Sequence, residues 1–256
     1  PHIMLLIDDE KREIIEPLYQ SREKLEKLYD FNLNMGGGRI TGYKVDDTKE
    51  LREKFYALLE PERQNAKYGC DAGVLFAVGD GNHSLAVAKT MWNEIRKTLS
   101  AEERETHPAR YALVEIVNIY DEAMVLEPIH RVVSGGEKFI DKLKQNLSGE
   151  GSLKIITREG TQYISCPKAA SEAIKAVQAI VEEHIKGGAE EVDYIHGDKH
   201  LADVVNHTGF VGIFMPLFGR DELFNYVINV GNLPKKAFSI GGPEFKKYYL
   251  EAKLIK

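Results

Sequence analysis

A short glycine-rich turn holds the residues of this chain best suited to chemistry. It follows an apolar run at residues 74–78 and precedes a helical pattern in which Leu85, Trp92 and Leu99 share one face, which predicts Trp92 in a core. The first backbone N–H groups of a helix have no intrahelical partner, and the helix dipole favours anions there. A phosphate group is therefore the natural ligand of this segment. The turn consists of Gly79, Asp80, Gly81, Asn82, His83 and Ser84.

Each residue type in the turn suits a role in phosphate chemistry. Gly79 and Gly81 allow a ligand to approach the backbone closely, Asp80 could act as a base or hold a metal ion, and His83 could donate to a phosphoryl oxygen or shuttle a proton. The side chains of Asn82 and Ser84 could add hydrogen bonds to the phosphate. In the simpler interpretation, one acidic or amide side chain caps the helix, a glycine shapes the turn and the histidine is a surface residue.

Two other polar groups are candidates for a site. His130 and Arg131 are consecutive near the end of an expected strand, where they could bind a phosphate or carboxylate, with an exposed strand end as the alternative. Glu115 lies among apolar residues of another expected strand. Because a buried, unpaired carboxylate is costly, Glu115 belongs either to an active site or near a strand end.

Four further polar residues lie close together in sequence and suggest metal ligands. Within a strand, however, Asp193 and His196 are three residues apart and point to opposite faces, which argues against a shared ion. The glycines at 36–38 could approach a nucleotide, although a flexible turn is the simpler account. The four possible ligands are Asp193, His196, Asp198 and His200.

The composition places the chain among globular proteins. Its 256 residues are 43% hydrophobic and 29% charged, and the mean hydropathy is −0.33. No apolar run approaches the roughly 20 residues that cross a bilayer, and no signal-peptide pattern is present. Cys70 and Cys166 lack CxxC spacing and cannot form a disulfide framework. We therefore expect a cytoplasmic protein without a membrane partner.

The charge of the chain bears on its partners. A formal net charge of −6 and a pI of about 5.8 disfavour nucleic-acid binding through a general basic field. A small-molecule substrate or a nucleotide is the expected partner. A local basic patch would be the exception, and its residues would be Lys235, Lys236, Lys246 and Lys247.

Strand and helix patterns intermix without a strict period, which predicts an α/β or α+β fold with a mixed sheet flanked by helices. We expect residues 1–134 to form a lobe that carries the turn and residues 135–256 to form a second lobe, the two packed as one unit. The chain opens on a core-strand pattern, so we expect a preceding N-terminal segment. Strands are expected at 2–7, 39–45, 74–78, 110–120, 126–133, 153–156, 162–166, 192–196, 210–214 and 237–240, a last element at 248–255, and helices at 17–30, 51–59, 85–99, 139–147, 167–186, after 198 and at 221–230.

The turn with the alanines after it resembles the Asp-Gly-His-His-Arg signature of the domain-of-unknown-function family numbered 1015 (DUF1015). The segments at 1–9, 28–31, 128–133, 192–197, 233–241 and 248–252 also resemble that family, so the similarity spans nearly the whole chain. The signature turn of this family is similar to the turn of archaeal free-serine kinases. It is more distantly similar to the phosphate-binding turns of the ParB and sulfiredoxin superfamily. The resemblance implies a nucleotide phosphate at the helix N-terminus. Within the 233–241 segment, Lys235, Lys236 and Ser239 could close over a site, with a solvated basic strand as the default.

The signature carries over to this chain position by position. Asp80 and Gly81 match it directly, and His83 matches its second histidine. Asn82 stands where the signature has its first histidine, and Ser84 stands where it has arginine. The cation that would bind a phosphate bidentately is therefore absent from the turn.

That missing charge has two possible sources elsewhere in the sequence. Arg131 is the first, beside His130, and Arg39 after the three glycines is the second. With Arg131 in this role, His130 and Arg131 join Gly79, Gly81, Asn82 and Ser84 as residues expected to bind the nucleotide.

The resemblance implies a nucleotide- or phosphate-binding enzyme, with a phosphotransferase acting on a small, serine-like molecule as the candidate activity. Asp80 and His83 would be catalytic, Asp80 would also hold a metal ion, and the cofactor would be ADP or ATP with Mg²⁺. Two other functions stay open. One is a regulatory module that binds a nucleotide or anion without catalysis, and the other is a metal-dependent hydrolase using the same two residues.

Overall fold

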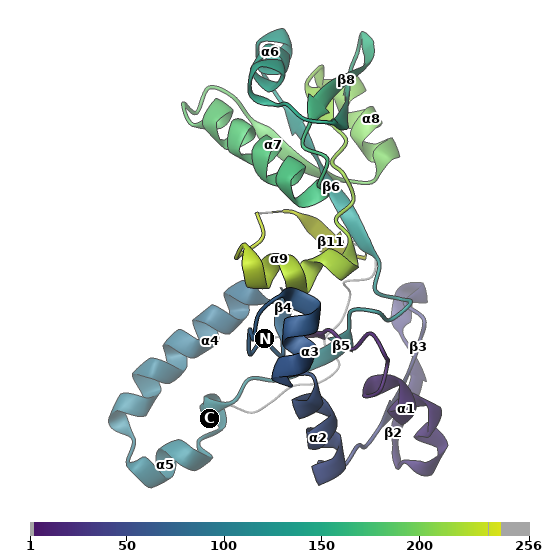
Figure 1. Cartoon of the computed structure of the whole chain (residues 1–256), viewed down its shortest axis with the longest axis vertical. Helices are drawn as coiled ribbons and strands as arrows, with labels where there is room; N and C mark the ends of the chain where they lie inside the picture. Colours follow the sequence, from purple (N-terminus) through teal and green to yellow (C-terminus); the bar gives the residue numbers. More distant parts are fainter. Residues whose placement is uncertain (1–2, 235, 242–256) are drawn as a thin grey trace. The chain divides into compact units, whose positions relative to one another are not determined.

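The computed structural model describes residues 3–234 and 236–241, apart from the side chain of residue 35. The chain divides into two compact units, and Figure 1 labels their helices and strands. The described residues of unit 1 are 3–124, and those of unit 2 are 125–241. The division after Met124 comes earlier than the expected one after Ser134, and it assigns His130 and Arg131 to unit 2.

Unit 1 is built on a three-stranded sheet in the order β4-β1-β5. The apolar run at the start of the chain forms its central strand, which is parallel to β5 and antiparallel to β4. Because of these directions, the carboxyl ends of β1 and β5 share one edge of the sheet, and β4 ends at the opposite edge. The strands are β1 (Ile3–Ile7), β4 (Ala77–Asp80) and β5 (Val114–Asn118).

Three short helices cover the core of unit 1. Ile7, Ile14 and Leu58 form its buried cluster, and Phe55 and Ile116 pack against them. The Thr48 side chain caps the second helix by accepting the Leu51 N–H at 3.1 Å, and a proline opens the third, where a missing N–H costs nothing. The helices are α1 (Ile15–Gln20), α2 (Lys49–Ala57) and α3 (Pro61–Tyr68).

The turn at 79–84 leads into a helical hairpin. Helix α4 (Asn82–Ile95) runs into a 3₁₀ turn (Arg96–Thr98) and is followed by α5 (Ala101–Thr106). Ser100 and Glu103 form a reciprocal capping box at the start of α5. None of the residues of α4 is fully buried, and Trp92 is half-buried, so Trp92 is not a fully enclosed core residue.

The expected helix at 17–30 is wrong beyond Gln20. The Ser21 hydroxyl donates to the Pro17 carbonyl at 2.8 Å as the helix ends, and a β-hairpin follows. In that hairpin, Arg39 donates to Asp30 at 2.7 and 2.9 Å, and this hydrogen bond holds the pKa of Asp30 at about 2. Cross-strand pairing thus overrides the helical spacing of the leucines. The strands are β2 (Lys27–Asn32) and β3 (Arg39–Tyr43).

The expected strand at 74–78 is displaced toward the turn. The Val74 carbonyl accepts a hydrogen bond from the Gln64 side chain at 3.2 Å, and pairing with β1 begins only at Ala77. The register then shifts between Met4 and Leu5 before Asp80 pairs with Met4. Glycine at position 79 suits such a bulge.

Unit 2 contains a six-stranded sheet. β6 is its organising strand, since it pairs with β9, β10 and β11, all antiparallel. Its bounds agree with the expected strand at 126–133. The strands are β6 (Leu126–Val133), β7 (Gly151–Thr157), β8 (Gly160–Cys166), β9 (Val192–His196), β10 (Val211–Ile213) and β11 (Phe238–Ile240).

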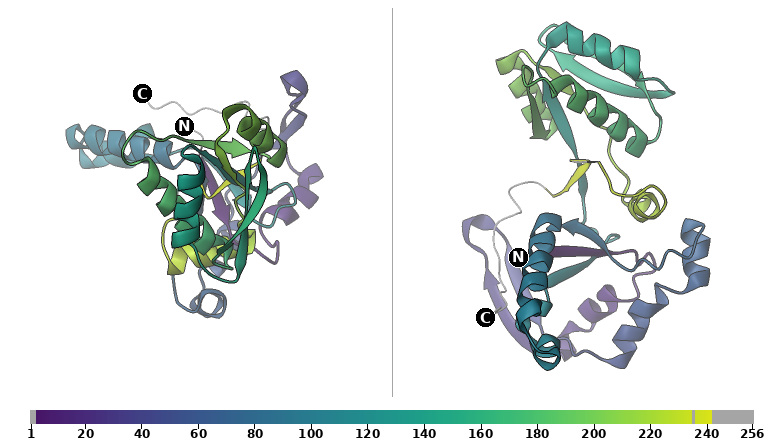
Figure 2. Two further views of the ribbon diagram at one scale, coloured as in Figure 1. Left: turned by 90° about the horizontal axis from the view of Figure 1, so that it is seen from above. Right: turned by 90° about the vertical axis from the view of Figure 1, so that its left-hand side faces the viewer.

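Helices cover both faces of the unit 2 sheet, as the right-hand view of Figure 2 shows, with α8 in light green and α6 in teal. Helix α8 packs on the face of Val132, and it approaches Gly212 so closely that a Cβ there would lie 2.7 Å from the Val205 side chain. This architecture confirms the mixed α/β prediction. The helices are α6 (Gly136–Asn146), α7 (Ala170–Ile185), α8 (Asp198–Thr208) and α9 (Leu223–Asn229).

Some expectations fall outside the part of the chain that the structure describes. They are the last element at 248–255 and the lysines at 235, 246 and 247. Over the described ranges, the helices are too short or too polar to cross a bilayer.

The core of unit 1 generates a stability prediction. Ile7→Ala should lower the free energy of unfolding by about 2–5 kcal/mol, because it removes a fully buried side chain and leaves a cavity. Leu28→Ala, at a side chain that is 54% exposed, is the control and should change it by only about 0.5 kcal/mol. Urea unfolding followed by tryptophan fluorescence reports on unit 1, which holds the single tryptophan of the chain. Equal effects of the two substitutions would contradict this description of the core.

Candidate functional site

The expected turn joins β4 directly to α4. Gly81 is the N-cap residue of this 14-residue helix and has a φ of 88°, in the left-handed region that glycine adopts without strain. The Gly81 carbonyl accepts the Leu85 N–H at 2.9 Å, which closes the first helical turn. The chain thus reverses from strand to helix over a single residue.

The side chains of the turn are accessible. Asp80, Asn82 and His83 are exposed, and Ser84 is half-buried. Asp80 Oδ1 accepts the Gly81 N–H at 2.8 Å, so this carboxylate binds the backbone just ahead of the helix. The N-cap residue is Gly81, which has no side chain and so makes no side-chain cap hydrogen bond.

The first turn of α4 differs electrostatically from two comparable turns. Helices α6 and α8 also begin after glycines with positive φ, Gly135 and Gly197, and also lack a side-chain cap. Both carry an acidic residue in the first turn, Glu137 and Asp198, whereas the first turn of α4 carries none. Among these three described helices, α4 is the one whose positive end is not compensated from within its own first turn.

The sheet places a second carboxylate beside the turn. Asp80 on β4 and Glu115 on β5 both pair with Met4 of the central strand, so the three residues form one row. Residues in one row share a face of the sheet, and two strand spacings separate the outer Cα atoms by about 10 Å. Glu115 is exposed and is the second residue of β5, so it lies near a strand end, one of its two expected settings.

In unit 2, His130 is a buried histidine with both ring nitrogens engaged. Its Nδ1 accepts the Met215 N–H at 3.1 Å, which leaves Nε2–H to donate to Asp198 at 2.9 Å. The ring lies 5.3 Å from that of Phe214, and burial lowers the pKa of His130 below its usual value. These contacts make His130 a neutral residue that ties β6 to the start of α8.

Arg131 is fully buried within unit 2. Its guanidinium donates to the Gln178 side chain at 3.1 Å and to the Lys236 carbonyl at 3.0 Å, and it lies 5.3 Å from the Tyr194 ring. Burial lowers its pKa to about 10. Its contacts connect β6 with α7 and β9, and its role as the cation of the turn stays a prediction.

The remaining sequence candidates are dispersed. Among the described residues, no three His, Cys, Asp or Glu side chains are grouped to hold a metal ion, which disfavours a metal site at positions 193–200. The glycines at 36–38 close the β2–β3 hairpin, where the Leu33 N–H donates to the Gly38 carbonyl at 2.8 Å. Arg39 is engaged by Asp30, and the Ser239 hydroxyl donates to the Gly241 carbonyl at 2.9 Å.

A polar cluster that sequence reasoning did not single out lies at the shared carboxyl edge of β1 and β5. Lys67 donates to Asp8 at 2.7 Å and to the Tyr120 hydroxyl at 3.2 Å, and the Tyr68 hydroxyl also donates to Asp8. Burial, assisted by the negative charge of Asp8, raises the pKa of both tyrosines. The acid pair Asp8–Asp9 directly after a buried strand is the signal that could have identified it.

This cluster is structural. The cavity beside it measures about 10 Å³, which accommodates about one water molecule and no substrate. Although burial of the ammonium opposes it, the hydrogen bond and charge of Asp8 raise the pKa of Lys67, so the ion pair is maintained at neutral pH. The cluster binds α3 to the end of β1, at the edge of the sheet opposite the turn.

The lowered pKa of His130 predicts a pH-dependent stability of unit 2. Below about pH 6.5 the unfolded chain binds a proton that the buried ring resists, so stability is lost as the pH falls. One such proton contributes at most about 1.4 kcal/mol per pH unit. Amide exchange at Met215, corrected for the intrinsic rate, should show protection falling from pH 7 to pH 5.

His130→Gln should remove this part of the pH dependence, because glutamine does not titrate. His200→Gln, at an exposed position of the same unit, is the control and should leave it in place. If protection at Met215 fell equally with pH in the native chain and in the His130→Gln variant, His130 would not be the source of the pH dependence.

Comparison with solved structures gives partial similarities. A conserved hypothetical protein from Pyrococcus furiosus shares 13% identity and a TM-score of 0.47, over 75% of this chain and 84% of that one. A free serine kinase in complex with AMP shares 12% identity and a TM-score of 0.45, over 76% of this chain and 80% of that one. A mutant of a free serine kinase in complex with AMP shares 12% identity and a TM-score of 0.46, over 73% of this chain and 79% of that one. At TM-scores below 0.5 these similarities do not assign a function. No curated protein matches the chain.

A family model, in contrast, matches most of the sequence. The model is DUF1015, described as a protein of unknown function, and it covers residues 1–194. That range includes all of the described unit 1, the turn at 79–84 and His130–Arg131. The family resemblance inferred from short motifs is therefore confirmed over residues 1–194, whereas the similarity of the segments at 233–241 and 248–252 and the more distant likeness to ParB and sulfiredoxin stay predictions. The chain belongs to the DUF1015 family.

Proposed function

We propose that the turn at 79–84 binds the phosphate group of a nucleotide. The observation that carries this proposal is the first turn of α4, which follows a left-handed glycine, has no side-chain cap and contains no acidic residue. The backbone N–H groups of Asn82, His83 and Ser84 precede the first intrahelical bond. Phosphate oxygens are suited to accept from such groups, and the helix dipole adds to their attraction.

Phosphotransfer to a small hydroxyl compound is the chemistry that we propose for this site. The hydroxyl oxygen attacks the terminal phosphorus of the nucleotide, the bond from that phosphorus to the leaving phosphate oxygen breaks, and Asp80 takes the hydroxyl proton. Mg²⁺ commonly binds through one or two carboxylates together with substrate phosphates. The exposed Asp80, with Glu115 in the same row of the sheet, fits that coordination. When bound, the ion would offset the charge of the phosphates.

Charge placed in the helical turn tests phosphate binding. Ser84→Asp puts a carboxylate at the third helical position of α4, where it should weaken the binding of ADP about tenfold or more by occupying the N–H groups and repelling phosphate. The same change should stabilise the helix by about 0.3–1 kcal/mol. Isothermal titration calorimetry with ADP and a thermal melt measure the two effects.

His200→Asp is the matched control, because His200 occupies the third helical position of α8 after Gly197. It should leave ADP binding unchanged. If Ser84→Asp also stabilises the chain without changing ADP affinity, or if the native chain does not bind ADP at millimolar concentration, the turn is a helix start and not a phosphate site.

Asp80→Asn separates catalysis from binding. It keeps the shape of the side chain but removes its charge, so we expect ADP without Mg²⁺ to bind as before while phosphate transfer from ATP to serine or a similar hydroxyl compound falls at least about a hundredfold. Phosphorus NMR follows the product. Binding by the native chain without transfer to any hydroxyl compound would favour the non-catalytic regulatory module.

A further inference from the structure

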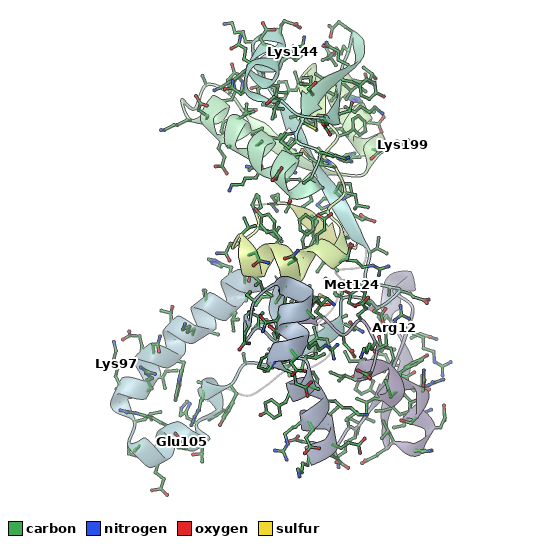
Figure 3. All side chains as sticks on the ribbon, viewed as in Figure 1. Arg12, Lys97, Glu105, Met124, Lys144 and Lys199 are labelled. Carbon is green, nitrogen blue, oxygen red and sulfur yellow. The ribbon has the colours of Figure 1, made fainter. Side chains whose placement is uncertain are left out.

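A basic pocket lies at the opposite end of α4 from the turn. It has a volume of about 490 Å³, within the range of small-molecule sites, and all of its lining residues belong to unit 1. Figure 3 labels two of them, Lys97 at the end of α4 and Glu105 in α5. The lining residues are Trp92, Arg96, Lys97, Arg104, Glu105 and Arg110.

Within the part of the chain that the structure describes, the ion pairs of the pocket leave two of its guanidinium groups without a carboxylate partner. Lys97 is paired with Glu94 at 2.8 Å, and Arg110 is paired with Glu105. Arg96 and Arg104 form no ion pair with any carboxylate of the described residues. The lining therefore carries more positive than negative side chains, although the chain as a whole has a net charge of −6.

The backbone brings the two arginines to one place. Arg104 Nε donates to the Arg96 carbonyl at 2.8 Å, which ties α5 back onto the end of α4. Both side chains are exposed and line the same pocket. Two like charges in one pocket repel each other, and a bound anion would relieve that repulsion.

The chemistry of the lining points to a phosphate with a planar ring attached. The forked donors of arginine match phosphate oxygens better than a lysine ammonium does. Trp92 is half-buried in the wall, and an indole ring offers a surface on which a base can stack. We propose that this pocket binds a nucleoside phosphate, at a site separate from the turn.

The separation follows from the length of the helix. With 14 residues, α4 spans about 21 Å, and the turn and the pocket lie at its two ends. The pocket also does not depend on the proposed function, because it shares no residue with the turn. The two sites can therefore be tested independently.

Trp92 makes the test direct, since it is the single tryptophan of the chain. Titration with ADP in the absence of Mg²⁺ should change its fluorescence saturably, after correction against free tryptophan for absorption by ADP. Pyrophosphate should compete with ADP, adenosine should bind far more weakly, and added salt should reduce the affinity for ADP.

Arg96→Gln and Arg104→Gln should each weaken ADP binding at this pocket about tenfold or more. Arg52→Gln, an exposed arginine on α2, and Ser84→Asp at the turn are the controls and should leave the Trp92 signal unchanged. Calorimetry on the Ser84→Asp variant then isolates binding at the pocket.

Three results would overturn the proposal. One is the absence of a Trp92 response to millimolar ADP. Another is a lower melting temperature in Arg96→Gln and Arg104→Gln with unchanged ADP affinity. That result would mean that these cations only stabilise the negative, carboxyl-terminal end of a helix dipole. The last is tighter binding of single-stranded RNA than of ADP, with affinity rising with length, which would replace the proposal with a nucleic-acid surface.

Discussion

The N–H groups of the first turn of α4 lie before the first intrahelical hydrogen bond, and the proposed site depends on them. A helix cannot satisfy these donors internally, and the N-cap residue Gly81 has no side chain to accept from them. The first helical turns of α6 and α8 each contain an acidic residue, whereas the first helical turn of α4 contains none. The sheet adds to this constraint. Because β4 runs antiparallel to β1, the turn emerges at the edge where Asp80 and Glu115 share a row.

Polar groups in this protein divide into those satisfied internally and those presented to solvent. The Asp8–Lys67 pair connects elements within unit 1, and the His130–Asp198 pair connects elements within unit 2. The first turn of α4 and Arg96 present donors outward. The first kind stabilises the fold, whereas the second kind is available for a ligand.

Much of the fold could be predicted from local pattern. The apolar runs gave β1 and β6 with nearly their observed bounds, and the amphipathic pattern gave α7. The strand expected at 39–45 agrees with β3, but β2 was missed because its pairing with β3, which includes the Arg39–Asp30 hydrogen bonds, does not appear in the hydrophobic period.

The candidate site was predictable in part. The strand, glycine turn and helix are adjacent in sequence, so the turn at 79–84 could be identified before its geometry was known. The structural roles of His130 and Arg131 could not, since their partners Met215, Asp198 and Gln178 come from distant elements. The basic pocket could not be predicted either, because Arg96 and Arg104 come together only when α5 folds back onto the end of α4.

The most direct test of the central claim observes the backbone N–H groups themselves. Amide chemical shifts of the ¹⁵N-labelled chain, recorded during titration with inorganic phosphate and then with ADP, would report on Asn82, His83 and Ser84 individually. If the first turn of α4 binds phosphate, these amides should show saturable downfield proton shifts, with no comparable shift at Lys199 and His200 in the first turn of α8. Shifts that are absent from α4, or equal at both helices, would contradict it.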